Sequence, residues 1–335
     1  MRKLPVIFAA SAALALTLAG CAGSPAPSSS PTSGATAAPQ AAAGSCTDTP
    51  SGSASDSVKV TGDAGSVAAA TFDSPVNIDA TQRTVLSNGD GPKANVGDFG
   101  ILNFTMFNGT SGDKVFSTYD QGSASLSMVV DATQFLPGLV KGVECLNGGS
   151  RIAVAAPASE GFGEKGNSAL GITATDPLVF VVDLGQVLPA NDPSQLKANG
   201  EAQPAVDGVP TVVDAEDGTP TVTIPDTAPP ADLTVTVLKK GAGKVVESGQ
   251  PSVVQYQGSI WGTKAVFDQS WGKQPFAVQP GSTVQGFEAA IAGQTVGSQV
   301  IVSIPPAQGY GDKGQPQAGI SGTDTLVFVI DILAG

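Results

Sequence analysis

The sequence contains no histidine, and this absence removes several classes of chemistry before any motif is considered. A Ser-His-Asp triad and a Cys-His pair both need an imidazole, so nucleophilic hydrolysis of these types is excluded. Imidazole metal ligands and imidazole general bases are excluded for the same reason. Any function of this chain must therefore work without imidazole.

Basic residues are also scarce, because 16 Lys and Arg stand against 29 Asp and Glu, a formal net charge of −13. Phosphate backbones need a broad positive surface, so we do not expect nucleic-acid binding. Charged residues make up only 13% of the chain, whereas it has 42 glycines and 25 prolines. This composition favours strands and turns over long surface helices. A length of 335 residues suggests about two domains.

Residues 1–20 have the pattern of a lipoprotein signal peptide. Arg2 and Lys3 precede a run of apolar or small residues over 4–18, and the segment ends in Leu18-Ala19-Gly20-Cys21, which looks like a bacterial lipobox. We expect signal removal to leave Cys21 as a lipidated N-terminus that anchors the chain to the outer side of the cell membrane. The alternatives are an ordinary signal peptide with a chance cysteine and a transmembrane anchor, for which the run is short.

Residues 21–56 are mostly Ser, Pro, Ala, Gly and Thr, and predict a disordered tether. Outside the cytoplasm thiols oxidise, and a lipidated Cys21 would leave Cys46 and Cys145 as an even pair. We expect these two to form a disulfide, with two free thiols as the alternative. In the chain-entropy model a bridge across so long a loop contributes about 4 to 5 kcal/mol.

Past the tether the sequence repeats itself. The residues 161–166, Gly-Phe-Gly-Glu-Lys-Gly, return as Gly-Tyr-Gly-Asp-Lys-Gly over 309–314, and 175–183 return over 323–331 at the same offset of 148. Upstream the offset drifts, to 151 if Phe116 matches Phe267 and to 152 if Phe104 matches Tyr256. The repeat predicts two homologous domains, over 77–189 and 226–335.

The segment 190–225 between the two domains is rich in Pro, Asp, Ala and Gly. Its short apolar pieces, 208–213 and 219–224, are compatible with edge strands, where proline is tolerated. It is therefore either a linker or a pair of edge strands, and the sequence alone leaves both open.

Each copy consists mostly of short β-branched runs bounded by Gly or Pro, which predict strands. The clearest helix begins near Gly286, since Phe287 and Ile291 share one face and Gly293 can end it. We therefore expect an α+β fold in each domain, with an antiparallel sheet wrapped on a short helix and a crevice between them.

Six motifs of the second copy resemble, in order and spacing, the FKBP-type peptidyl-prolyl isomerases, over about 100 residues and more loosely in the first copy. They are Val253-Val254-Gln255-Tyr256, Val266-Phe267-Asp268-Gln269-Ser270, Gln274-Pro275-Phe276, Val284-Gln285-Gly286-Phe287-Glu288, Gly309-Tyr310-Gly311 and Leu326-Val327-Phe328. The resemblance implies two tandem FKBP-like domains. It also implies isomerase activity on X-Pro bonds of proline-containing polypeptides, bound in an apolar crevice.

By this resemblance Tyr256, Asp268 and Tyr310 are the catalytic residues, with the Tyr310 hydroxyl donating to the substrate carbonyl. The resemblance also assigns a set of substrate-binding residues that line the crevice: Phe267, Phe276, Thr283, Val284, Phe287, Ile320 and Phe328. Phe287 stands where the family usually has tryptophan. Where the family often has an arginine beside the aspartate, this sequence offers only Lys273.

Rotation about an X-Pro bond crosses a barrier of roughly 20 kcal/mol without making or breaking a covalent bond. We therefore expect neither a metal nor another cofactor, and the family's macrolide ligands are possible partners. Apart from the enzyme, we consider a binding module that grips proline-containing segments without turnover, and a passive surface protein. Taken one at a time, the crevice aromatics and Asp268 would more often be core and turn residues.

The first copy keeps apolar residues but lacks the polar groups. We match Phe104 to Tyr256, Ser117 to Asp268 and Phe162 to Tyr310, so the hydroxyls and the carboxylate are lost. The remaining matches are apolar throughout: Leu139 for Phe287, Leu126 for Phe276, and the retained Phe116 and Phe180. This predicts a weak or inactive first domain.

Three further residues have simpler interpretations. Asp183 and Asp331 lie at strand ends and are expected on the surface. Trp271 either rims the crevice or covers the neighbouring loop.

Overall fold

The computed structural model describes residues 44–120 and 125–335. The expected signal peptide, Cys21 and residues 21–43 of the expected tether lie outside the described residues. Among the described residues, no helix has the length and apolar character that crossing a bilayer requires.

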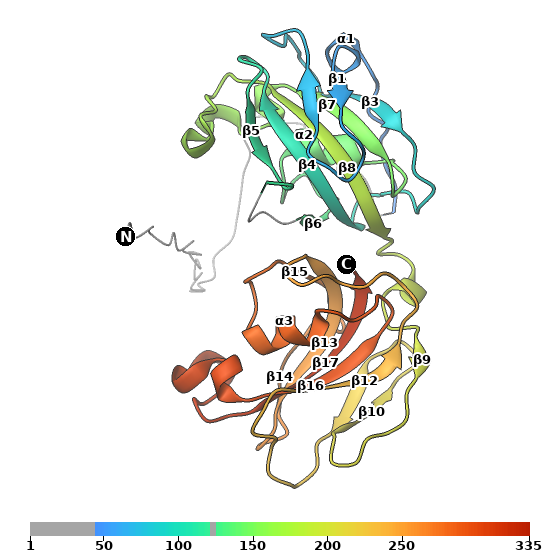
Figure 1. The fold of residues 1–335 in the computed structure, drawn as a ribbon, viewed down its shortest axis with the longest axis vertical. Helices are drawn as coiled ribbons and strands as arrows, with labels where there is room; N and C mark the ends of the chain where they lie inside the picture. The colour runs from blue at the N-terminus through green and yellow to red at the C-terminus, as the bar shows by residue number, and fades with distance from the viewer. Residues whose placement is uncertain (1–43, 121–124) are drawn as a thin grey trace, which may run out of the picture. The chain divides into compact units, whose positions relative to one another are not determined.

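The first domain contains an antiparallel sheet with the strand order β3-β7-β8-β4-β5, in which β6 also pairs with β4 (Figure 1). Its helices and strands are α1 (Ser53–Asp56), β1 (Lys59–Thr61), β2 (Ala69–Thr71), β3 (Gln82–Ser87), β4 (Phe99–Asn108), β5 (Lys114–Ser117), β6 (Leu126–Val129), α2 (Pro137–Val143), β7 (Arg151–Ala156) and β8 (Leu178–Leu188). Between β7 and β8 lie the 3-10 turns η1 (Ala158–Glu160), η2 (Gly163–Lys165) and η3 (Ser168–Leu170), and η4 (Pro193–Gln195) follows β8.

The second domain repeats this plan with the strand order β14-β13-β17-β16-β12-β9, and β15 pairs with β13 (Figure 1). Its elements are β9 (Glu201–Ala202), β10 (Thr211–Asp214), β11 (Pro220–Thr223), β12 (Thr234–Lys240), β13 (Ser252–Ile260), β14 (Val266–Gln269), β15 (Phe276–Val278), α3 (Gln285–Ile291), β16 (Gln299–Ile304) and β17 (Leu326–Ala334). The turns η5 (Pro306–Gln308), η6 (Gly311–Lys313) and η7 (Pro316–Ala318) connect β16 to β17.

The helices α2 and α3 pack against β7 and β16 of their own domains. Both contacts depend on a glycine, because a Cβ on Gly138 would lie 2.4 Å from the Ala156 Cβ and one on Gly286 would lie 2.5 Å from the Ile304 Cγ2. Side chains in these places would push the helix off the sheet. In both copies, therefore, a glycine in the helix sets how closely the helix packs against the sheet.

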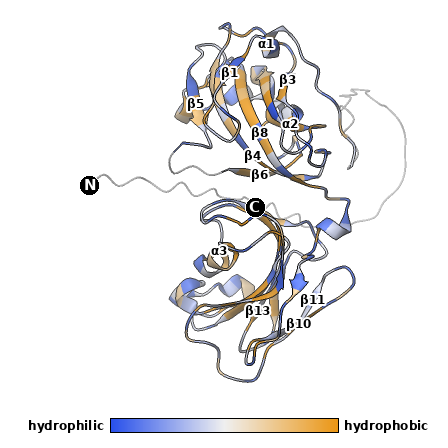
Figure 2. Ribbon diagram, turned by 45° about the vertical axis from the view of Figure 1, so that its right-hand side comes forward, coloured by the Kyte–Doolittle hydropathy of each residue, from blue (hydrophilic) through white to orange (hydrophobic). Residues whose placement is uncertain are grey.

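Each sheet buries its helix-facing side in one apolar core. In the first domain Ile152, Val154 and Phe180 are fully buried beneath α2. In the second, Val300, Val302 and Ile330 are fully buried beneath α3. Figure 2 shows the apolar colouring along the sheet strands, including β4 and β8.

A short hairpin covers the opposite face of each sheet. The antiparallel hairpin β1–β2 and its flanks bury Val58 and Ala68 in a cluster with Ala153, Val179 and other residues of β7 and β8. The hairpin β10–β11 closes a matching cluster in the second domain, whose members are Val212, Val222, Ile224, Trp261, Ile301, Val327 and Val329. Each repeat therefore includes its own hairpin.

Because the first domain includes residues before β3, its expected N-terminal boundary at residue 77 needs correction. Residues 44–56 are not part of a disordered tether: Cys46 is joined to Cys145 by a disulfide with a Cα–Cα distance of 5.3 Å, and the Thr47 N–H donates to Glu144 Oε1 at 2.8 Å. Ala54 is buried in the outer cluster. The first domain therefore begins near residue 44 rather than at 77.

The segment 190–225 also belongs to a domain. Its β9 extends the edge of the second sheet by pairing with β12, with Ala202 opposite Lys239. The hairpin β10–β11 is a separate sheet that lies over the outer face rather than along the edge. The pieces 208–213 and 219–224, expected as edge strands or linker, thus form a separate hairpin, and the edge strand lies at residues 201–202, where it was not predicted.

Candidate functional site

A cavity of about 580 Å³ opens in the second domain between α3, the start of β14 and the turn after β16. The lining includes nine of the residues expected there, namely Tyr256, Phe267, Asp268, Phe276, Thr283, Val284, Phe287, Tyr310 and Phe328. It also includes Ser282, Gln285 and Gly309, which the sequence analysis did not assign to the site. A cavity of this size is typical of small-ligand sites.

The walls of this cavity are aromatic rings in mutual contact. The ring of Phe287, on α3, lies 5.1 Å from that of Phe328 and 5.7 Å from that of Tyr256, measured between centroids. Phe267 meets Phe328 at 5.5 Å, and Phe276 meets Tyr256 at 5.6 Å. These edge-to-face contacts stabilise the rings in fixed orientations. Phe287 is only 3% exposed and forms the floor.

Gly258 makes this arrangement possible. A Cβ at this position would lie 2.7 Å from Phe267 Cζ and 2.7 Å from Phe328 Cε1. Only glycine lets the two rings meet over β13 without displacement. Gly258 is a site-forming residue that the sequence analysis missed, since a glycine inside a strand carries no functional group of its own.

A hydrogen-bonded pair of polar side chains, Tyr256 and Asp268, lies on the wall. The Tyr256 hydroxyl donates a hydrogen bond to Asp268 Oδ2, while Asp268 Oδ1 accepts one from the Gln269 N–H at 2.8 Å and lies 3.7 Å from Lys273 Nζ. Burial, the hydrogen bond to Asp268 and the charge of that carboxylate together raise the pKa of Tyr256 above its ordinary value. Tyr256 is therefore a neutral hydroxyl at physiological pH.

Tyr310 lies on the cavity rim with 37% of its surface exposed. Burial, followed by the charge of Asp268, raises the pKa of Tyr310 and keeps its hydroxyl protonated. Among the described residues this hydroxyl has no hydrogen-bond partner, so it is available to donate to a bound molecule. The turn η6, which begins at Gly311, holds Tyr310 in place.

Glu288 fixes the rim loop that precedes α3. Its Oε1 accepts hydrogen bonds from the Gly281 N–H at 2.9 Å and from the N–H and hydroxyl of Thr283, each at 3.3 Å. This carboxylate in the first turn of α3 stabilises the helix start while it orients the rim. These hydrogen bonds from the rim loop to Glu288 keep Thr283 and the adjacent Val284 on the cavity wall.

Two expected residues lie elsewhere. Ile320 is 2% exposed and packs in the apolar core, so it does not line the cavity. Its backbone pairs with Gln315, which directs the side chain inward. Trp271 is 7% exposed and lies against the Gly218 turn, where a Cβ would meet its ring at 2.8 Å. It covers the loop rather than the crevice rim.

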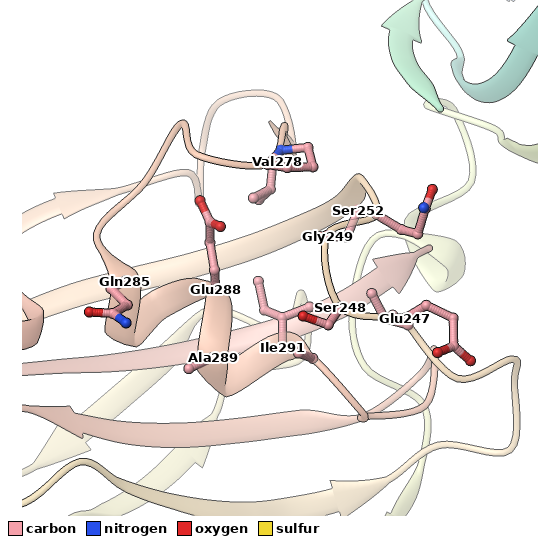
Figure 3. A pocket seen from close by; sticks show the side chains of 13 residues that line it. Glu247, Ser248, Gly249, Ser252, Val278, Gln285, Glu288, Ala289 and Ile291 are labelled. Atoms are coloured by element: carbon pink, nitrogen blue, oxygen red, sulfur yellow. The ribbon is translucent and has the colours of Figure 1, made fainter. Parts of the chain in front are cut away.

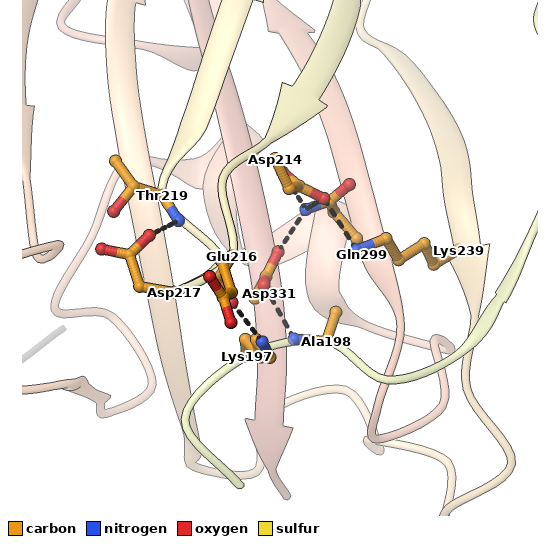
Figure 4. Close-up of polar contacts among 9 residues, drawn as sticks. All are labelled: Lys197, Ala198, Asp214, Glu216, Asp217, Thr219, Lys239, Gln299 and Asp331. Carbon is orange, nitrogen blue, oxygen red and sulfur yellow. Dashed lines mark hydrogen bonds and ion pairs between the residues drawn. The ribbon is translucent and has the colours of Figure 1, made fainter. Parts of the chain in front are cut away.

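Asp331 and Asp183 are not surface residues. Asp331 is 1% exposed; its Oδ2 accepts from the Ala198 N–H and its Oδ1 from Gln299 Nε2, both at 2.8 Å (Figure 4). Burial, with a smaller effect from the charge of Asp214, raises the pKa of Asp331 to about 6. Asp183 accepts from the Tyr119 hydroxyl at 2.7 Å. Both carboxylates face into the protein, where they accept hydrogen bonds from residues of neighbouring segments.

The sheet register corrects the match between the two copies. Asp268 pairs with Gly258, and Phe116 pairs with Met106 at the same place in the first sheet, with a bulge after both. The offset is therefore 152 along both strands. The counterpart of Asp268 is Phe116, not Ser117, and the counterpart of Phe267 is Val115.

The first domain is consequently more apolar than the sequence analysis predicted. Where the second domain has the hydrogen-bonded pair Tyr256 and Asp268, the first has Phe104 and Phe116, with ring centroids 5.4 Å apart. The exchange of Gly258 for Met106 is matched by that of Phe267 for the smaller Val115, which keeps the packed volume similar. The residues described contain no group of three His, Cys, Asp or Glu that could hold a metal.

Comparison with known proteins places the chain. The family model described as FKBP-type peptidyl-prolyl cis-trans isomerase matches residues 91–185 and 243–333, one segment in each domain. The chain is 34% identical over 118 residues to an FK506-binding protein of Streptomyces anulatus, which covers 34% of this chain and 95% of that protein. It is 31% identical over 116 residues to a probable FK506-binding protein of Corynebacterium glutamicum, with 34% and 97% covered.

Among solved structures, the three FKBP domains of wheat FKBP73 align with a TM-score of 0.32 and 19% identity, over 76% of this chain and 94% of that one. The assignment comes from the family model and the two bacterial relatives. The chain belongs to the FKBP-type peptidyl-prolyl cis-trans isomerase family and is an isomerase that acts on proline-containing substrates.

Proposed function

We propose that the second domain catalyses cis-trans isomerisation of X-Pro bonds in exported proteins, on the outer side of the cytoplasmic membrane. The observation that carries this proposal is the cavity itself. Five aromatic rings, the Tyr256–Asp268 pair and the free hydroxyl of Tyr310 converge on one space of about 580 Å³. The substrate proline would sit over Phe287.

The cavity favours rotation because the twisted imide has lost its amide resonance and is less polar than either planar form. Aromatic walls that exclude water stabilise the twisted form relative to the planar ones. Two protein groups complete this effect. Tyr310 donates to the substrate carbonyl, and the Asp268 carboxylate, held by Tyr256, fixes the electrostatic field along one wall. The reaction needs no metal and no other cofactor.

The first domain would bind apolar segments without turning them over. Its partly exposed apolar residues Phe104, Phe116, Leu126 and Phe162 pack at the corresponding place, but none of them offers a hydroxyl or carboxylate. This favours a second function for the chain, a non-catalytic chaperone or binding module for proline-containing segments.

The N-terminal sequence supports the proposed location of the protein outside the cytoplasmic membrane. We propose that Cys21 is lipidated after removal of residues 1–20 and tethers both domains to the membrane. The Cys46–Cys145 disulfide is in keeping with an oxidising compartment outside the cytoplasm. Replacing Cys21 by Ala should release the protein from the membrane fraction, and retention of the variant there would contradict the lipid anchor.

Macrolide binding is a further part of this proposal. The bacterial relatives are named FK506-binding proteins, and the aromatic cavity has the size and character of a small-ligand site. Titration of FK506 against the emission of Trp271, which belongs to the same domain, would test it.

The activity is tested on the full chain with an X-Pro peptide, by protease-coupled or NMR-exchange kinetics. Asp268→Ala and Tyr310→Phe should each lower kcat/KM about tenfold, because each removes one interaction worth about 1.4 kcal/mol in the transition state. Phe162→Leu in the first domain is the matched control and should leave kcat/KM unchanged. No turnover by the parent chain would favour the binding-module function instead.

A further inference from the structure

The second domain has another cavity, of about 260 Å³, behind the rim loop of the crevice (Figure 3). All of its lining residues belong to this domain, between the 246–252 loop, β15 and the outer side of α3. It shares Gln285 with the crevice, since Gln285 lines both. The two cavities therefore lie on either side of one residue.

The floor of this cavity is apolar and its edge is acidic. Val246, Val278 and Ile291 are 2%, 4% and 3% exposed and form the apolar part. Glu247 and Glu288 supply the carboxylates, and no lining residue is basic. Within residues 44–120 and 125–335, Glu247 forms no ion pair, and Glu288 uses only its Oε1 for hydrogen bonds.

Ser252 adds an unpartnered polar group to the cavity lining. It lines the cavity and is 1% exposed, yet its hydroxyl forms no hydrogen bond within the part of the chain that the structure describes. The hydroxyl is not one of the fully buried side-chain atoms that lack a partner, so it reaches the cavity and is available to a bound group. In Figure 3 Ser252 and Ser248 lie on the side of the cavity opposite Glu288.

We propose that this cavity binds the side chain of a lysine or arginine in the same polypeptide whose proline occupies the crevice. The inference rests on the proposed function. An aliphatic stem would cover Val278 and Ile291, while the cation would donate to Ser252 and be attracted by Glu288 and Glu247, whose carboxylates lie on opposite sides of the cavity (Figure 3). The volume suits one side chain rather than a separate small ligand, which usually needs more than about 300 Å³.

The polypeptide can reach both cavities at once. An extended chain advances roughly 3.3 Å per residue, so only a few residues need separate the proline from the cation. Glu288 links the two sites, because it lines the second cavity and also holds Gly281 and Thr283 of the crevice rim. The cavity would thus select proline bonds that have a basic residue at one fixed spacing.

The test measures kcat/KM of the full chain on peptides with a single X-Pro bond. A lysine is moved from three positions before the proline to five after it, and each peptide is paired with its glutamine counterpart. At one spacing the lysine peptide should be preferred about two- to fivefold, the effect of an exposed ion pair of up to about 1 kcal/mol. Added salt should reduce this preference.

Variants of the two cavity carboxylates test whether the preference for lysine peptides arises in this cavity. Glu247→Gln and Glu288→Gln should each bring the ratio toward one, and Glu288→Gln keeps the oxygen that accepts from the rim loop. Glu201→Gln, which removes an exposed carboxylate on β9, should leave the ratio unchanged. Equal rates for lysine and glutamine peptides at every spacing, or a preference that survives both cavity variants, would overturn the inference. Absence of turnover on all peptides would instead overturn the proposed function.

Discussion

The buried carboxylate of Asp331 gives the second domain an unusual pH dependence. Its raised pKa means that the folded domain keeps a proton between about pH 4 and pH 6, where the unfolded chain has lost it. The stabilising contribution is therefore complete below the unfolded pKa of 3.8 and is lost as the pH rises through about 6. Above that pH the domain carries a charge that is nearly excluded from water.

The size of the effect follows from the shift. A rise from 3.8 to about 6 corresponds to about 3 kcal/mol, since one pKa unit is worth 1.36 kcal/mol. Asp331→Asn removes this loss but leaves one amide hydrogen facing a donor, either the Ala198 N–H or Gln299 Nε2, which costs about 1 kcal/mol. We expect the variant to be about 1 to 2 kcal/mol more stable than the parent at pH 8 and about 1 kcal/mol less stable at pH 4.

Urea denaturation followed by tryptophan emission measures the free energy of unfolding of the second domain separately from that of the first. The chain has two tryptophans, Trp261 and Trp271, and both are buried in the second domain. The exposed Asp207→Asn is the control for a change in net charge and should follow the parent at every pH. The reasoning is refuted if Asp331→Asn changes the free energy of unfolding by the same amount at pH 4 and pH 8.

Three further predictions concern the crevice and the first domain. Gly258→Ala should lower the stability of the second domain by about 1 to 3 kcal/mol through clashes with Phe267 and Phe328, and adding Phe267→Val, which removes the first clash, should restore part of the stability in urea but not kcat/KM. Because the pKa of Tyr310 is raised, kcat/KM should hold beyond pH 10, and a decline with a midpoint below 10 in a pH profile would count against its role. Replacing Cys46 and Cys145 by Ala should destabilise the first domain by about 4 to 5 kcal/mol, and unchanged resistance to proteolysis in urea would contradict this.

The sequence predicts most of the crevice because family motifs there are local and aromatic. It also predicts the paired cysteines, since Cys46 and Cys145 are the two left once Cys21 is set aside. The register of β14, in contrast, could not be predicted from the sequence. It depends on backbone pairing across the sheet, and matching Phe116 to Phe267 by residue type shifted that strand by one position. A one-residue shift exchanges the two faces of a strand, and so it put Ser117 instead of Phe116 at the position of Asp268.

The hairpin β1–β2 could not be predicted for another reason. Val58, Ala68 and Ala54 are too small to give a periodic apolar signal, yet they suffice to cover a flat sheet face made of Ala153 and Ala155. The buried state of Asp331 also escapes prediction. It depends on Ala198, which is 133 residues away in the chain and donates the hydrogen bond that replaces water.

The central claim is that the polar groups of the second crevice, which the first domain lacks, carry the activity. The most direct measurement gives the second crevice the side chains of the first, Tyr256→Phe, Asp268→Phe and Tyr310→Phe, in the full chain. The account predicts that kcat/KM on an X-Pro peptide falls about a hundredfold or more while the tryptophan emission stays native. A triple variant that folds and keeps more than half of the parent activity would contradict the account.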